Sequence, residues 1–206
     1  AAGHLPIDVK AQNIDFLSLS AHKFHGPKGI GVLYARSGIP ITSIIEGGDQ
    51  ERGRRAGTEN VPAVVGMAAA LEESCSHMAE NTIKLSALRD QLIAGLSRIP
   101  QAVLNGDVKN RLPGNVNFSF EGIEGESLVL LLDQQGICAS TGAACTSQSL
   151  SPSHVLLAIG RTSQEAVGAL RLSLSMDNTQ ADVDEVLRTV PELVKELRKN
   201  RDMVFF

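Results

Sequence analysis

One short stretch near the start of the chain places a hydroxyl, an imidazole and an amine within four residues. These groups belong to Ser20, His22 and Lys23, and apolar runs at 14–19 and 30–35 flank them. The flanking runs alternate as strands do, which predicts that Lys23 lies in a loop at the end of a buried strand. An amine in that setting loses its proton readily and can act as a nucleophile or a base. The alternative is a polar surface turn, because most lysines are solvated.

A second candidate is the segment 47–60, which has four glycines, three arginines and no hydrophobic periodicity. A loop this long within a compact domain is usually functional or disordered. Gly57 and Thr58, with arginines nearby, suit a phosphate held by backbone N–H groups and a hydroxyl. A solvated linker is the alternative reading of the same composition.

The three cysteines lie at unrelated positions, which argues against a disulfide framework and favours a reducing compartment. They also lack the paired spacing of a structural zinc site. Cys75 lies in an expected helix and Cys138 in an expected buried strand at 137–139, so both are predicted to be packed small hydrophobic residues. Cys145 lies in a polar loop of small residues, where a thiol has more value as a reactive group than as core.

Arg171 stands between leucines in the apolar run 170–174, which predicts a strand with Arg171 and Ser173 on one face. A charge in an apolar strand needs a partner if it is buried. Two partners are open at this stage. One is a carboxylate of the protein, and the other is the carboxylate of a substrate, bound by two parallel hydrogen bonds.

The hydrophobic periodicity predicts an α/β chain in two parts, with residues 1–78 ending a strand-rich region and residues 79–206 forming a smaller α+β domain. Helices are expected at 61–80, 81–98, 126–133, 151–159 and 179–197, and strands at 14–19, 30–35, 102–104, 115–120, 137–139 and 170–174. Helical spacing places Val65, Ala68, Ala69 and Leu71 on the apolar face of the first helix and Ile83 on that of the second. A capping box at 179–182 should open the last helix, whose inward residues are expected to include Val183, Val186, Val190 and Val194. The chain opens without Met and without a helix or strand signal, so we expect the C-terminal portion of a longer fold.

The charge and hydrophobic pattern of the sequence argue against nucleic acid and membranes as partners. The net charge of −4 is mild and unsegregated, so neither nucleic acid nor an anionic membrane is expected as a partner. No apolar run approaches the roughly 18 residues that a membrane-spanning helix needs. No secretory signal is recognisable at the start of the sequence.

Four segments resemble, in order, those of class V aminotransferase-fold enzymes that use pyridoxal 5′-phosphate, and more narrowly the NifS/IscS type of cysteine desulfurase. They are the segments 20–29, 47–60, 139–147 and 170–174. The resemblance covers essentially the whole chain. It implies the C-terminal part of an aspartate aminotransferase-like large domain at 1–78, followed by a small C-terminal domain that carries the cysteine loop.

The resemblance also implies a role for each candidate residue. Lys23 would carry the cofactor covalently and later move the Cα proton of the substrate. Ser20 and His22 would hydrogen-bond the cofactor phosphate. Thr58 would reach the phosphate of the neighbouring subunit's cofactor, which implies a homodimer with shared active sites.

In the same way, Arg171 would bind the carboxylate of L-cysteine, and Cys145 would attack the substrate sulfur. The implied products are L-alanine and a persulfide on Cys145, which passes its sulfur to an acceptor such as an iron–sulfur scaffold protein in the cytoplasm. No resident metal is expected, and a transient iron–sulfur contact at Cys145 stays open. The alternatives are selenocysteine lyase, another class V enzyme, or an incomplete fragment that serves only in dimerisation or partner docking.

Some features depart from the family pattern. The cysteine loop reads Ser-Thr-Gly-Ala-Ala-Cys where the family usually has Ser-Ser-Gly-Ser-Ala-Cys, and Ser175 stands where glycine commonly follows the arginine strand. The family's Asp-x-x-Gln segment, stacking histidine and another phosphate-binding segment precede the residues that match Ala1. These 206 residues alone are therefore expected to bind the cofactor weakly or not at all.

Overall fold

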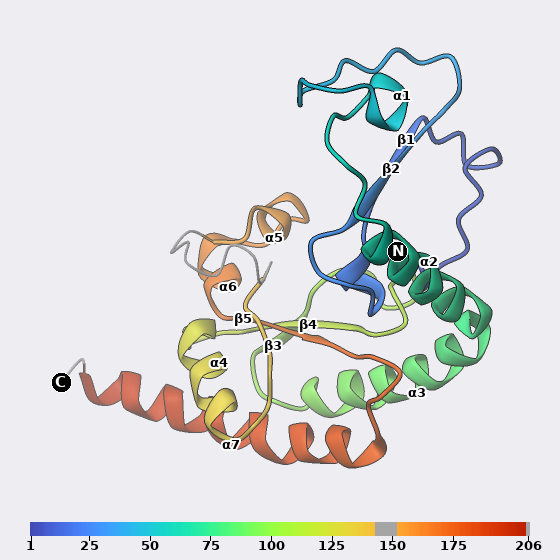
Figure 1. Cartoon of the computed structure of the whole chain (residues 1–206). Coiled ribbons are helices and arrows are strands. Elements are labelled where there is room, and N and C mark those ends of the chain that lie inside the picture. The colour runs from blue at the N-terminus through green and yellow to red at the C-terminus, as the bar shows by residue number, and fades with distance from the viewer. Residues whose placement is uncertain (143–151, 205–206) are drawn as a thin grey trace. The chain divides into compact units, whose positions relative to one another are not determined.

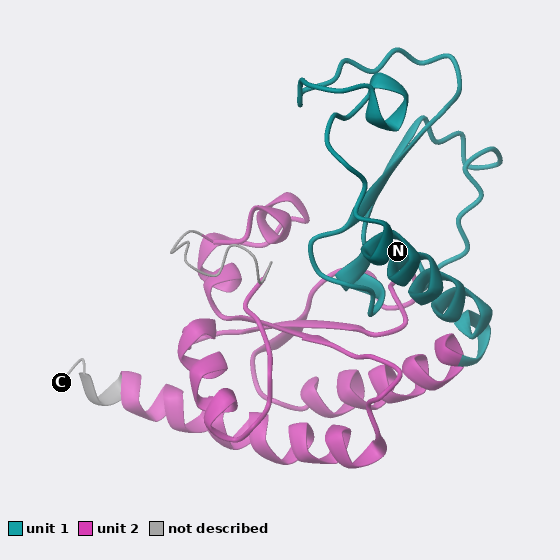
Figure 2. Cartoon of the chain, viewed as in Figure 1, with its two compact units in different colours: residues 1–80 teal, residues 81–206 magenta. Residues whose placement is uncertain are grey.

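The computed structural model describes residues 1–142 and 152–204. The chain divides into two compact units, Ala1–Glu80 and Asn81–Phe206 (Figure 1, Figure 2). Both units mix helix with strand, which agrees with the α/β prediction. The assignment of the two parts as a cofactor-binding domain and a small domain stays a prediction.

The first unit is built on two antiparallel strands joined by residues 21–30, which begin with a 3₁₀ turn. Its elements are β1 (Phe16–Ser20), the 3₁₀ turn η1 (Ala21–Phe24), β2 (Gly31–Ala35), the short α1 (Gln50–Gly53) and α2 (Val61–Ser76). Ser20 pairs with Gly31 at the turn end of the ladder, and Phe16 pairs with Ala35 at the other end. The two strands predicted around Lys23 are thereby confirmed, each within two residues of its expected bounds.

Helix α2 begins where the sequence predicted it, but it buries a different face. The Asn60 side chain accepts a hydrogen bond from the N–H of Ala63 at 3.2 Å and caps the helix start. Met67 is the buried residue of the helix and packs with Ala21 and Phe24 of the turn. Val65, expected on the buried face with Ala68 and Ala69, is 61% exposed, and both alanines are exposed as well.

The second unit is a three-stranded antiparallel sheet in the order β3-β4-β5, packed against helices. Its elements are α3 (Met78–Leu96, which begins just before the boundary), β3 (Ala102–Leu104), β4 (Asn115–Phe120), α4 (Gly125–Gln134), α5 (His154–Ala158), α6 (Ser163–Val167), β5 (Ala169–Ser173) and α7 (Gln180–Val204). Because β4 alternates, Val116, Phe118 and Phe120 face the core and Asn115 and Asn117 lie on the other face.

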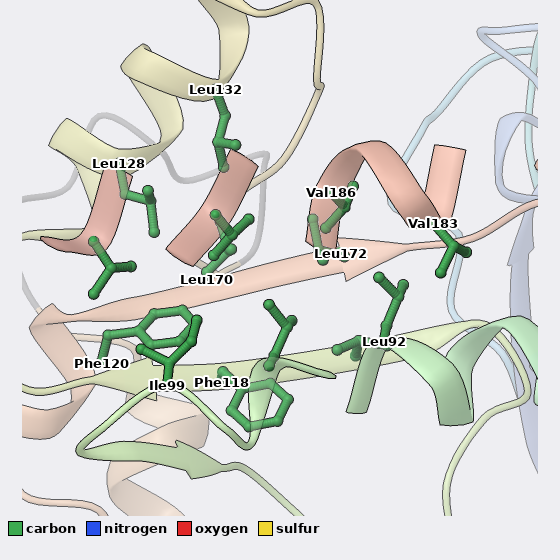
Figure 3. Close-up of a cluster of buried hydrophobic side chains, with 14 of the residues drawn as sticks. Leu92, Ile99, Phe118, Phe120, Leu128, Leu132, Leu170, Leu172, Val183 and Val186 are labelled. Atoms are coloured by element: carbon green, nitrogen blue, oxygen red, sulfur yellow. The ribbon is translucent and has the colours of Figure 1, made fainter. Parts of the chain in front are cut away.

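The core of this unit lies between the apolar face of the sheet and helices α3, α4 and α7 (Figure 3). Leu92, Leu128, Leu170 and Val190 are each at most 1% exposed. At the start of α7, the Asp182 carboxylate accepts the N–H of Thr179 at 2.8 Å, which is one arm of the predicted capping box. The predicted inward face of α7 is confirmed by the burial of Val183, Val186, Val190 and Val194.

Several local predictions were wrong. No strand forms at 137–139; this segment follows the C-terminal turn of α4, and Ser140 after it forms an isolated bridge with Arg171. Cys138 is therefore exposed rather than packed, and Cys75 is exposed on α2, outside the face that packs on η1. Ile83, expected to point inward on α3, is 75% exposed.

The helix expected from 151 begins later, at His154, with Ser153 before it. The run at 41–45, although rich in β-branched residues, forms no strand. Within residues 1–142 and 152–204, no helix combines the length and the apolar character needed to cross a membrane.

Candidate active site

Lys23 lies in η1, a turn that is anchored by its own ends. Ala21 and Phe24 are 0% and 2% exposed, whereas Lys23 between them is exposed. The N–H of Ala21 donates to the carbonyl of Ile30 at 3.1 Å, and the carbonyl of Ala21 accepts the N–H of Gly26 at 2.9 Å. The two buried side chains hold the turn from below, so the Lys23 amine is presented outward.

Close packing restricts this turn further. A Cβ at Gly26 would lie 2.8 Å from the Cβ of Ala21, so a larger residue would force the two ends of the turn apart. From α2, the hydroxyl of Ser74 donates to the carbonyl of Phe24 at 3.4 Å. Helix α2 therefore supports the turn through both the apolar contact of Met67 and this hydrogen bond.

The structure brings Ser20, His22 and Lys23 together on this single turn. Ser20 is the last residue of β1, and all three residues are exposed. The prediction of a buried strand before Lys23 was wrong for this chain, because Phe16 is 48% exposed and no residue of β1 is fully buried. The end of β1 and η1 thus expose a hydroxyl, an imidazole and an amine within four residues.

His4 is a neighbour of the turn that the sequence did not single out. Burial lowers the pKa of His4 below its ordinary 6.5, and the positive charges of the N-terminal amine and of His25 lower it further. A hydrogen bond with the backbone of Lys23 acts in the opposite direction. The net effect favours a neutral imidazole at His4. This residue lies next to η1 and the preceding Ser20, which together are called the lysine turn below.

Thr58 lies in the same unit, within the long loop 47–60. This loop makes one short turn at α1, where Glu51 and Arg52 adopt left-handed φ values of 51° and 59°. The N–H of Gly57 donates to the side-chain oxygen of Gln50 at 2.9 Å, so the loop is internally braced. Thr58 is exposed, and none of the hydrogen bonds within the described residues joins it to the lysine turn.

Arg171 lies in β5 of the second unit, at the position predicted. Its backbone N–H donates to the carbonyl of Ser140 at 2.6 Å, and the Ser140 N–H donates back at 3.2 Å. Its Nε is buried and has no acceptor among the described residues, and no described carboxylate forms an ion pair with it. Leaving a buried charged donor unpaired is costly, about 1–3 kcal/mol or more, so this guanidinium is suited to an external acceptor.

The sequence did not predict a network of polar side chains that lies on the same face of the sheet as Arg171. The Nε of Arg161 donates to Oδ1 of Asn105 at 2.7 Å. Nδ2 of Asn105 donates to Oδ1 of Asn117 at 2.7 Å and to Oγ of Ser119 at 3.0 Å. Asn117 stands directly opposite Arg171 in the ladder. The available signal was the alternation of β4, which places Asn117 on its polar face.

Cys145, predicted to be the nucleophile, lies outside the described residues. Its role therefore stays a prediction from the sequence. Apart from Thr58 in the loop 47–60, the described candidates form two groups, one on the lysine turn of the first unit and one around Arg171 in the second.

Comparison with known proteins identifies the family of the chain. Residues 1–186 match the aminotransferase class-V family. The chain is 55% identical over 202 residues to the cysteine desulfurase IscS of Clostridium botulinum (strain Hall), covering 97% of this chain and 51% of that protein. It is 57% identical over 198 residues to the cysteine desulfurase IscS of Methanosarcina thermophila, covering 96% of this chain and 49% of that protein.

Among solved structures, a NifS-like protein superposes with a TM-score of 0.85 at 38% sequence identity, over 96% of this chain and 50% of the other. The chain belongs to the class-V aminotransferase family, with the NifS-like type of fold. It spans about half the length of the curated relatives that it matches.

Proposed function

We propose that the protein to which this chain belongs is a pyridoxal-phosphate-dependent cysteine desulfurase. The observation that carries the proposal is the lysine turn, where an amine, an imidazole and a hydroxyl are all exposed within four residues, next to the buried Ala21 and Phe24. The names of the similar proteins support the choice of reaction. Cys145 supports it too, because a plain aminotransferase has no need of a thiol nucleophile.

The residues of the turn fit the cofactor chemically. A primary amine is the group that an aldehyde cofactor requires, and the neighbouring hydroxyl and imidazole are hydrogen-bonding groups suited to a phosphate. In this proposal Lys23 attaches the cofactor, Ser20 and His22 bind its phosphate, and Thr58 binds the phosphate in the neighbouring subunit of a homodimer. When bound, the cofactor supplies an electron sink next to the substrate Cα.

The chain's own residues then have distinct tasks. Arg171 binds the carboxylate of L-cysteine and so fixes the orientation of the bound substrate. Lys23, in its neutral form, takes the Cα proton and returns a proton to the product. The Cys145 thiolate attacks the substrate sulfur, so that a sulfur–sulfur bond forms while the carbon–sulfur bond breaks and the carbon gains a proton. The products are L-alanine and a persulfide on Cys145.

Three substitutions in the full-length enzyme test these tasks. Lys23→Ala should abolish covalent attachment of the cofactor, which absorbance spectroscopy detects. Cys145→Ala should still change the cofactor spectrum on mixing with L-cysteine but should form no persulfide in a single turnover. Arg171→Ala should mainly raise KM for L-cysteine. Alanine and persulfide formation by Cys145→Ala would overturn the proposal.

The same assay separates the alternatives. A selenocysteine lyase should prefer selenocysteine strongly over cysteine, and another class V enzyme should release no persulfide. The exposed face of β1 and the exposed Lys23 favour one further statement, that residues 1–206 alone bind the cofactor weakly. A cofactor absorbance band in this chain by itself, as strong as in the full-length protein, would contradict it. The sulfur acceptor, the homodimer and the cytoplasmic location belong to the same proposal.

A further inference from the structure

We propose that Asn117 is a second binding residue for the substrate carboxylate. We further propose that Arg161, acting through Asn105, determines which end of the Asn117 side-chain amide is free to bind it. This inference rests on the function proposed above, because it assigns Arg171 to the carboxylate of L-cysteine. It concerns only residues of the second unit. Its basis is the donor-to-acceptor direction of the hydrogen bonds that link Arg161, Asn105 and Asn117.

Arg161 determines the direction of the first bond. A guanidinium only donates hydrogen bonds, so the Asn105 atom that Arg161 Nε contacts at 2.7 Å is the carbonyl oxygen Oδ1. A second guanidinium nitrogen, Nη2, donates to the Leu104 carbonyl at 2.8 Å, and Nη1 lies 3.6 Å from the Glu165 carboxylate. Three contacts hold this side chain, so the first link of the network is fixed.

The orientation of the Asn105 side-chain amide in turn determines the orientation of the Asn117 amide. With Oδ1 used by Arg161, its Nδ2 is the group that faces Asn117 and Ser119, at 2.7 and 3.0 Å. The Asn105 backbone is also fixed, because its N–H donates to the Asn117 carbonyl at 2.8 Å and its carbonyl accepts from Arg111 at 2.7 Å. Asn105 is 4% exposed and has all its polar groups paired, so it has no room to flip.

Asn117 is therefore oriented by its neighbour. Its Oδ1 receives the Asn105 hydrogen bond, which leaves Nδ2 as its remaining polar group, a donor without an acceptor among the described residues. Asn117 is the direct cross-strand partner of Arg171. Opposed residues of an antiparallel pair share one face, with Cβ atoms about 4.5–5.5 Å apart. Two unpaired donors, Asn117 Nδ2 and Arg171 Nε, thus belong to neighbouring side chains.

Two donors side by side match the two oxygens of a carboxylate. A reversed amide would instead present a carbonyl oxygen beside Arg171, which would pair with the guanidinium and compete with the substrate. The donor-only character of Arg161 excludes this reversed arrangement. The network therefore explains why a neutral amide, rather than a carboxylate, stands opposite the substrate-binding arginine.

The test measures carboxylate recognition separately from stability. In the full-length holoenzyme, calorimetric titration is carried out with L-alanine and with L-alaninamide, which has an amide in place of the carboxylate. The measured ratio is the dissociation constant for L-alaninamide divided by that for L-alanine, so a high ratio means strong recognition of the carboxylate. Asn117→Ala should reduce this ratio about 10-fold to 100-fold, as expected for a lost hydrogen bond to a charged group. Asn117→Asp should reduce it at least as much, because the new carboxylate pairs with Arg171.

Matched variants identify the role of the network. Arg161→Lys keeps a donor and should keep the ratio, whereas Arg161→Met should lower it. Asn115→Ala, on the same strand face but opposite Ser173, should leave it unchanged. The KM for L-cysteine should follow the same order. Thermal unfolding of each variant shows whether it folds; if Arg161→Met does not, the two Asn117 variants still decide.

The outcomes separate this inference from the proposed function. If Arg171→Ala lowers the ratio but both Asn117 variants leave it at the wild-type value, Asn117 is not a binding residue and the inference is wrong. If the wild-type enzyme shows no preference for alanine over alaninamide, the assignment of Arg171 itself fails, and the inference fails with it.

Discussion

The two units of the chain differ in how much apolar surface they bury. In the second unit, sixteen buried side chains form one cluster between the sheet and three helices (Figure 3). In the first unit, the cluster around the lysine turn has three buried members, Ala21, Phe24 and Met67. These counts refer to the described residues, and they show that the two candidate groups are supported in different ways.

The first unit also exposes large apolar side chains on its strands. Phe16, Val32 and Leu33 are 48%, 43% and 54% exposed, and Val61 and Val65 on α2 are each 61% exposed. Exposed apolar residues gathered on neighbouring elements are typical of a surface that another part or another chain covers. The Arg171 group thus lies on a self-sufficient scaffold, whereas the lysine turn lies on a scaffold that needs further contacts.

The largest expected effect follows directly from this contrast. A chain of residues 81–206 alone should fold and unfold cooperatively in urea, because its core lies within that range. A chain of residues 1–80 alone should show no cooperative transition, since a cluster of three buried residues cannot offset the conformational entropy of folding. Circular dichroism during urea titration measures both. A sharp transition in the 1–80 chain would show that the comparison of the two cores is wrong.

A single core residue of the second unit should have the next largest effect. Leu128→Ala removes a fully buried side chain from α4 and should lower the free energy of unfolding by about 2–5 kcal/mol. Leu130→Ala, on the same helix but 66% exposed, is the matched control and should change it by less than about 0.5 kcal/mol. Urea unfolding of residues 1–206 distinguishes them, and equal effects would mean that α4 does not pack as described.

The same contrast explains which parts of the fold the sequence could predict. In the second unit, periodicity identified strands 102–104 and 115–120 and the inward face of α7, because one side of each element meets a real core. In α2 it failed, since apolar residues lie on most sides of the helix. Local pattern shows which residues are apolar, and only tertiary contacts decide which of them are buried.

The candidate site was predictable to a similar degree. The turn around Lys23 and the strand position of Arg171 follow from local sequence. The network of Arg161, Asn105 and Asn117 does not, because its members come from the α5–α6 connection, the residue after β3 and strand β4, which are distant in sequence and meet only in the folded unit. The exposure of Cys138 was missed for the same reason, since among the described residues that follow α4 (137–142) Ser140 alone bridges to β5.

A smaller effect should come from the acid side of the pH range. The N–H and then the hydroxyl of Thr162 lower the pKa of Glu165 below its ordinary 4.5. A lowered folded-state pKa means that the ionised form is stabilised by folding, so its contribution is present above pH 4.5 and is lost as pH falls through the folded pKa. Glu165→Gln should therefore lose less stability than the wild type between pH 5 and the folded pKa.

Urea midpoints at several pH values measure this difference. Glu196→Gln, at an exposed position on α7, serves as the control and should follow the wild-type curve. Parallel curves for Glu165→Gln and the wild type would mean that the capping box at the start of α6 contributes nothing to the acid sensitivity of the second unit.

The smallest expected effect concerns the contribution of the Ser74 hydrogen bond to the stability of the lysine turn. Ser74→Ala removes the 3.4 Å hydrogen bond to the Phe24 carbonyl, a long bond whose loss should cost about 0.5 kcal/mol or less. The turn keeps its buried anchors, so the amide of Gly26, which donates to Ala21, should exchange with solvent only slightly faster. Ser76→Ala, whose hydroxyl bonds within its own helix, is the matched control. A loss of Gly26 protection as large as that caused by Met67→Ala would show that the hydrogen bond holds Lys23 in place as much as the apolar contact does.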